Sequence, residues 1–247
     1  MIPTSDPNNC KDRDPAVKIR STRWRHRLPV EVMLAVAVTL FPEVLFGQAV
    51  PQPPRQDFQA WTAIEATHPV GKNTDFLLSA GLRYGNDQRQ LTYRRIAAGF
   101  AFHWSRFFTF EPYYQYSVSD AFPKILSHEN RLALAATVGA PWKRWEISDR
   151  SVLDLRFLQD RRSWRYRDRV EFRRPIGVAR KRLSLFAWDE VYYSPIARRW
   201  YRNRLALGVG RRLSRKLSID VFFVHQNDGY SRPGDVNALG TTLKARF

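Results

Sequence analysis

Two short segments of the sequence contain the residue types used in nucleophilic catalysis. His103-Trp-Ser105 places an imidazole and a hydroxyl two residues apart, which puts both on one face of an extended strand. A histidine in that position can act as the general base for a serine nucleophile in lipid hydrolysis or acyl transfer. A second, looser group contains His225, Asn227 and Ser231. Histidines at the ends of strands also serve as plain structural groups, so both segments provide candidates without assigning an activity.

A third segment favours electrostatic rather than covalent chemistry. In Arg167-Asp-Arg-Val-Glu-Phe-Arg173, alternation places Arg167, Arg169, Glu171 and Arg173 on one face. The formal net charge of the whole chain is +18. A nucleic-acid binder usually gathers such charge on one face or in one tail. Here arginine is spread along the chain, so we expect no nucleic-acid partner.

Motifs for bound groups are missing from the sequence. It contains no glycine-rich phosphate-binding loop. His68 and His128 have no zinc-ligand spacing. We therefore expect neither a cofactor nor a metal.

Eleven segments that follow residue 57 alternate between apolar and polar residues, and a period of two predicts strands rather than helices. In one of them Leu205, Leu207 and Val209 alternate with Arg204 and Ala206. The eleven segments are 58–68, 74–84, 94–104, 107–118, 129–139, 146–157, 164–175, 183–193, 200–211, 217–227 and 237–247. Their lengths suit tilted membrane-spanning strands, and shorter and longer connections alternate. The sequence thus predicts an all-β fold, an antiparallel transmembrane (outer-membrane) barrel of about 10–12 strands, and an even number is expected because single-chain bacterial barrels are even.

The C-terminal segment supports a membrane barrel. Residues 237–247 alternate strictly, with Leu243, Ala245 and Phe247 on one face and Gly240 shortly before them. In a soluble domain this strand would leave an apolar stripe and an open edge, whereas in a barrel the stripe faces lipid. The ending resembles the signal by which bacterial outer-membrane barrels are recognised for assembly. That resemblance implies the barrel-assembly machinery as a partner.

The N-terminal region predicts export. A long basic lead precedes a ten-residue apolar run at 32–41, and small residues follow at Gly47 and Ala49. This layout is typical of a cleaved signal peptide, and the run is too short to span a bilayer as a helix. The alternatives are a short membrane anchor and an internal helix of a soluble protein. We assign residues 1–49 to the signal peptide, 50–57 to a Pro-rich linker and 58–247 to the barrel.

The polar face of each strand is expected to line the barrel lumen, where arginines outnumber carboxylates. The candidate lumen-lining residues are Arg83, Arg95, Arg131, Arg156, Arg167, Arg169, Glu171, Arg173, Arg202 and Arg204. Unpaired guanidinium groups in a wet lumen attract anions. The first functional hypothesis is therefore a small anion-selective pore or a structural surface protein. Two alternatives are an enzyme that modifies lipid A or phospholipid and an exported soluble basic β-barrel that binds acidic ligands.

Four short motifs allow a comparison with a known family. They are Arg-x-Arg-x-Glu-x-Arg at 167–173, Glu-Asn-Arg at 129–131, Asp-Glu-Val-Tyr at 189–192 and Tyr-Arg-Asn-Arg-Leu at 201–205. Over about residues 57–247 the sequence resembles the bacterial outer-membrane family catalogued as domain of unknown function 2490. The resemblance implies a barrel in the bacterial outer membrane with no established activity. We expect it to contact outer-membrane lipid and lipopolysaccharide and to be a monomer.

Overall fold

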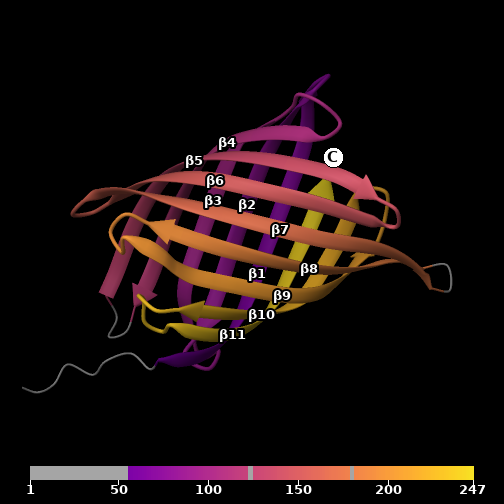
Figure 1. Ribbon diagram of the computed structural model, residues 1–247. Coiled ribbons are helices and arrows are strands. Elements are labelled where there is room, and N and C mark those ends of the chain that lie inside the picture. Colours follow the sequence, from indigo (N-terminus) through magenta and orange to yellow (C-terminus); the bar gives the residue numbers. More distant parts are fainter. Residues whose placement is uncertain (1–54, 122–124, 179–180) are drawn as a thin grey trace, which may run out of the picture. The chain divides into compact units, whose positions relative to one another are not determined.

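The computed structural model describes residues 55–121, 125–178 and 181–247, which form one closed barrel of β-strands (Figure 1). The strands are β1 (Gln56–Gly71), β2 (Thr74–Gly85), β3 (Gln90–His103), β4 (Phe108–Ala121), β5 (Ile125–Trp142), β6 (Trp145–Leu158), β7 (Arg162–Val178), β8 (Lys181–Ser194), β9 (Arg199–Arg212), β10 (Leu217–Asp228) and β11 (Asp235–Arg246). The all-β barrel predicted from the alternation is confirmed. The expected signal peptide, residues 1–49, lies outside the described residues. Within those residues there is no helix long and apolar enough to cross a membrane.

The barrel closes in a way that the sequence did not suggest. Neighbouring strands pair antiparallel from β1 through to β11, but β1 and β11 pair in parallel, from Gln56 opposite Asp235 to Thr67 opposite Arg246. The expectation of an even strand number is therefore wrong. A parallel ladder satisfies the same backbone donors and acceptors, so an odd number of strands can close without leaving an edge.

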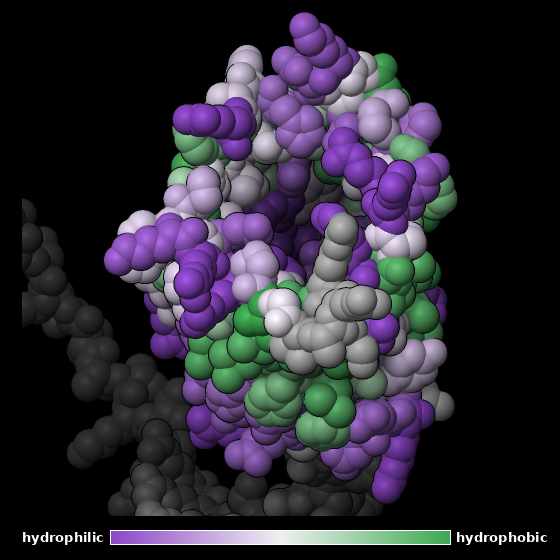
Figure 2. All heavy atoms as spheres, turned by 90° about the vertical axis from the view of Figure 1, so that its right-hand side faces the viewer, coloured by the Kyte–Doolittle hydropathy of each residue, from purple (hydrophilic) through white to green (hydrophobic). Residues whose placement is uncertain are grey.

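The two ends of the barrel differ in their connections. One end, the turn end, carries the connections after β1, β3, β5, β7 and β9 together with Phe247, and these connections have two to four residues. The other end, the loop end, carries the remaining connections, of three to six residues, and the start of β1. The loops are shorter than expected, because β3 begins at Gln90 rather than at residue 94 and β5 begins at Ile125 rather than at residue 129. Figure 2 views the turn end and shows a hollow lined by hydrophilic side chains.

The outer wall of the barrel is largely apolar. Ile96, Leu207, Val221 and Leu239 are half or more exposed. Alternate residues of the same strands point into the barrel, as period-two geometry requires. An outward apolar face and a polar interior are the arrangement of a membrane barrel rather than of a soluble one.

One sector of the lumen is apolar and tightly filled. Its buried cluster is formed by Trp61, Phe186, Trp188, Ala206, Val224, Val236 and Ala238. The ring of Phe222 packs against this cluster and lies over Gly240, where an added Cβ would be 2.2 Å from the Phe222 Cζ atom. The absence of a side chain at Gly240 therefore makes room for this ring. One sector of the lumen is thus filled by apolar side chains, and another part of the lumen is polar.

Candidate functional site

The polar part of the lumen contains a cavity of about 690 Å³. Every residue predicted from alternation to line the lumen lies around this cavity: Arg83, Arg95, Arg131, Arg156, Arg167, Arg169, Glu171, Arg173, Arg202 and Arg204. Arg165 also lines it and was not singled out from the sequence, although it has the same parity as Arg167 on β7. Tyr113 and Tyr192 were missed as well, because tyrosine occurs on both faces of these strands.

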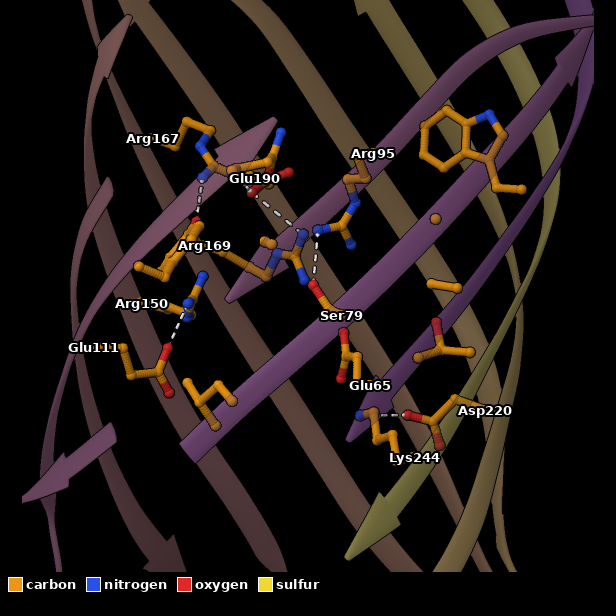
Figure 3. Close-up of a pocket in the computed structure, with 18 of the residues that line it drawn as sticks. Glu65, Ser79, Arg95, Glu111, Arg150, Arg167, Arg169, Glu190, Asp220 and Lys244 are labelled. Atoms are coloured by element: carbon orange, nitrogen blue, oxygen red, sulfur yellow. Dashed lines mark hydrogen bonds and ion pairs between the residues drawn. The ribbon is translucent and has the colours of Figure 1, made fainter. Parts of the chain in front are cut away.

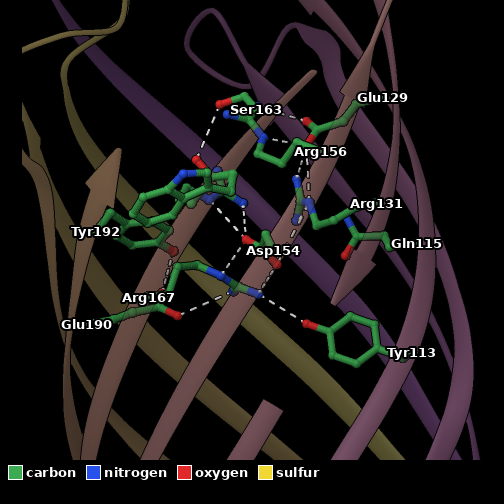
Figure 4. Close-up of polar contacts among 12 residues, drawn as sticks. Tyr113, Gln115, Glu129, Arg131, Asp154, Arg156, Ser163, Arg167, Glu190 and Tyr192 are labelled. Atoms are coloured by element: carbon green, nitrogen blue, oxygen red, sulfur yellow. Dashed lines mark hydrogen bonds and ion pairs between the residues drawn. The ribbon is translucent and has the colours of Figure 1, made fainter. Parts of the chain in front are cut away.

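A fully buried carboxylate organises the middle of one wall. Asp154 on β6 is 0% exposed and lies 2.7 Å from Nη2 of Arg165 and 2.9 Å from Nε of Arg167. Nε of Arg131 is 3.9 Å away (Figure 4). The pairing of β5 with β6 places the small Ala133 opposite Asp154, which leaves room for these long side chains. Several guanidinium groups thus converge on a single negative charge, in an environment where an unpaired ion is costly.

Glu190 on β8 extends this arrangement toward the neighbouring strands. Its carboxylate lies 3.2 Å from Arg169, 3.6 Å from Arg167 and 3.7 Å from Arg204. The hydroxyl of Tyr192 donates a hydrogen bond to Glu190.

Glu129 on β5 completes the network by binding Arg156 at 2.6 Å and Arg131 at 2.9 Å. We call the ion pairs centred on Asp154, Glu190 and Glu129 the Asp154 network. It joins residues of β5 to β9 along one wall of the lumen, with Asp154 and Glu190 buried and Glu129 partly buried.

The cavity lining carries an excess of positive charge. Among the described residues, eleven arginines and one lysine face six carboxylates and the buried Asp154. The lining carboxylates are Glu65, Glu111, Glu129, Glu171, Glu190 and Asp220. Low-dielectric walls focus such a field, so the excess raises the local concentration of anions.

The catalytic pair proposed at His103 and Ser105 does not form. The Ser105 hydroxyl accepts hydrogen bonds from the backbone N–H groups of Phe107 and Phe108, both at 3.1 Å, and so stabilises the turn. Nδ1 of His103 lies instead 3.1 Å from the Thr109 hydroxyl, and Nε2 lies 3.2 Å from Asp75. Asp75, His103 and Thr109 thus place a carboxylate, an imidazole and a hydroxyl in line, but the hydroxyl is that of Thr109 and not that of Ser105. Within the described residues His103 is the only side chain that hydrogen-bonds the Thr109 hydroxyl.

The second group of catalytic candidates is also separated. Nδ1 of His225 contacts the side-chain oxygen of Asn237 at 2.9 Å on the outer face of the barrel. The Ser231 hydroxyl donates to Asp228 at 2.6 Å and accepts from Arg202, so it is held at the loop end. In the described part of the chain no serine or threonine hydroxyl contacts His225. Nor do those residues include a group of three or more His, Cys, Asp or Glu arranged to hold a metal ion.

The C-terminal residues occupy the closing strand. Phe247 is 64% exposed at the turn end, and its N–H donates to the carbonyl of Thr67 on β1 at 3.1 Å. Leu243 and Ala245 have outward parity, whereas Gly240 lies on the lumen side behind Phe222. A role of these four residues in assembly stays a prediction.

Comparison with known proteins places the chain in a family. The model of the family described as protein of unknown function (DUF2490) matches residues 58–237. The chain belongs to this family. The resemblance inferred from the short motifs is thereby confirmed. No curated protein shows a significant match.

Two solved outer-membrane barrels are similar in fold to this family member. A KdgM porin is 9% identical, with 69% of this chain and 91% of that chain covered and a TM-score of 0.42. LpxR from Salmonella typhimurium is 8% identical, with 70% and 83% covered and a TM-score of 0.43. At these identities the similarity concerns the fold alone.

Proposed function

We propose that this protein resides in the bacterial outer membrane and passes small anions through its arginine-rich lumen. The observation that carries the proposal is the excess of cations over carboxylates around the cavity. Charged rings in a narrow passage set the sign of the ion that enters. The ligand class is therefore small inorganic or organic anions.

The accessibility of the charges supports the same sign of selectivity. The side chains of Lys244, Arg169 and Arg150 are 42%, 35% and 32% exposed. The carboxylates of Asp154 and Glu190 are 0% and 3% exposed. Glu171 and Glu111 are 23% and 20% exposed, so the most accessible of these charged groups that a solute meets are the three cations.

The outer surface and the C-terminal strand support the proposed location. The exposed apolar side chains of the wall suit contact with outer-membrane lipid and lipopolysaccharide. The alternating face of β11, with Leu243 and Ala245 followed by Phe247, suits recognition by the barrel-assembly machinery. A closed barrel has no free edge for pairing with another chain, which favours a monomer.

Chloride flux into liposomes tests the proposal. Full-length mature protein refolded into vesicles should admit chloride, and Arg169→Gln should reduce the flux because a partly exposed lumen cation is lost. The reduction should be larger at low salt, since the Debye length falls from about 30 Å at 0.01 M to about 3 Å at 1 M. Arg94→Gln is the matched control, because Arg94 neighbours Arg95 on β3 but is exposed on the outer face. Vesicles that contain folded barrel and admit no chloride would exclude passage and favour a structural surface role.

A further inference from the structure

Two arginines that line the cavity lie on β2 and β3, outside the strands β5 to β9 that carry the Asp154 network. Arg83 on β2 pairs with Tyr93 on β3, and Arg95 on β3 pairs with Gly81 on β2. Arg83 and Arg95 therefore lie diagonally across adjacent strands and face the same cavity. Both are partly exposed.

These two arginines are the lining cations without a carboxylate partner. Within the described residues, every other arginine that lines the cavity, and Lys244, has a carboxylate oxygen within 4.0 Å. Arg83 and Arg95 have none among those residues. The lining carboxylate Glu65 on β1 also forms no ion pair there. Arg83 and Arg95 thus keep their charge available to a ligand.

Neighbouring side chains hold both guanidinium groups in place. The Cζ atom of Arg83 lies 3.9 Å from the centre of the Trp61 ring and 5.0 Å from that of Tyr93. Such stacking engages the face of a guanidinium group and leaves its N–H edge free. Arg95 lies over Gly81, where a Cβ would be 3.0 Å from its Nε atom, and its Nη1 atom donates to the Ser79 hydroxyl at 3.3 Å. These contacts lower the cost of ordering the two donors when a ligand binds.

The cavity also provides a further cation near these donors. Figure 3 shows Arg95 and Arg169 pointing into the same part of the cavity from opposite walls. Guanidinium groups bind carboxylate, phosphate or sulfate oxygens through paired N–H donors, a geometry that a halide ion cannot use fully. The cavity, with a volume of about 690 Å³, has room for a small anion that carries a carboxylate, phosphate or sulfate group.

We propose that Arg83 and Arg95 form a binding site for an oxyanion, so that the lumen retains multivalent oxyanions more strongly than halides. This inference rests on the proposed anion passage and names its preferred solutes: small molecules that carry phosphate, sulfate or carboxylate groups. Binding at this site is saturable, in contrast to attraction by the field of the whole lumen.

Calorimetric titration of the full-length mature barrel in detergent, with inorganic phosphate as the probe at constant ionic strength, tests the site. Wild type should bind phosphate saturably. The double variant Arg83→Met/Arg95→Met should bind at least about tenfold more weakly, because two charge-assisted donors are lost. Arg94→Met removes the same charge from the outer face and should bind as wild type does. Retained heat-modifiable mobility on gels identifies folded variants. If the double variant does not fold, Arg95→Lys keeps the charge, removes the paired donors and should still weaken binding several-fold.

Three outcomes overturn the site: no saturable phosphate binding by wild type, an equal loss in Arg94→Met, or displacement of phosphate by equimolar chloride. The proposed anion passage can fail independently of the proposed oxyanion site. Vesicles that admit no chloride, with phosphate binding intact in detergent, would exclude the passage and support a lumen that binds oxyanions without conducting them.

Discussion

Replacing Asp154 by asparagine should lower the free energy of unfolding of the barrel by about 3–5 kcal/mol, the cost of removing one partner from a buried ion pair. The change preserves side-chain size and removes the carboxylate charge that lies 2.7 Å from Arg165 and 2.9 Å from Arg167. Among the described residues Arg165 would then have no carboxylate within 4.0 Å, and Arg167 would keep only Glu190 at 3.6 Å, so both guanidinium groups would stay desolvated beside a neutral amide. Urea unfolding of the barrel refolded into lipid vesicles, followed by tryptophan fluorescence, measures the difference.

Asp235→Asn is the matched control for this experiment. Asp235 pairs with Arg55 at 3.3 Å, but the Arg55 side chain is 73% exposed. Loss of such an exposed pair should cost at most about 1 kcal/mol. Equal costs for the two asparagine variants would mean that the Asp154 network does not stabilise the barrel.

Leu207→Arg should destabilise the membrane-inserted barrel by about 2–4 kcal/mol, the cost of an arginine on the lipid face near the bilayer midplane. Leu207 is central in β9 and 62% exposed on the outer wall. Leu207→Ala separates the effect of charge from the loss of side-chain size. The same vesicle unfolding experiment compares the two. If the arginine variant is no less stable than the alanine variant, this wall does not face lipid.

Alternation predicts the faces of the strands well, because the two faces of a sheet differ in solvent. It cannot predict what fills the interior. Ala206 shares the face of Arg204, so alternation predicts only that it points into the lumen. In the structure Ala206 is 1% exposed within the apolar cluster that includes Trp188 and Val224, so a large side chain there would clash. Which lumen residues meet depends on the stagger between strands, and this is not written in any single strand.

Contacts between distant segments were the least predictable part. His103 binds Asp75, 28 residues earlier, rather than the nearby Ser105. The parallel pairing of β1 with β11 joins the first and last strands of the barrel and has no local signature. The polar pairs of the Asp154 network likewise join β5 to β9, whereas the excess of cations, a sum over all strands, was visible in the sequence.

The zero-current potential of the wild-type barrel in a planar bilayer, under a tenfold gradient of potassium chloride, tests the central claim most directly. A lumen that favours anions should bring this potential toward the equilibrium potential of chloride, and more strongly when both solutions are dilute. A zero-current potential nearer the equilibrium potential of potassium would contradict the proposed passage of anions. A correctly folded and inserted barrel without conductance would contradict it as well.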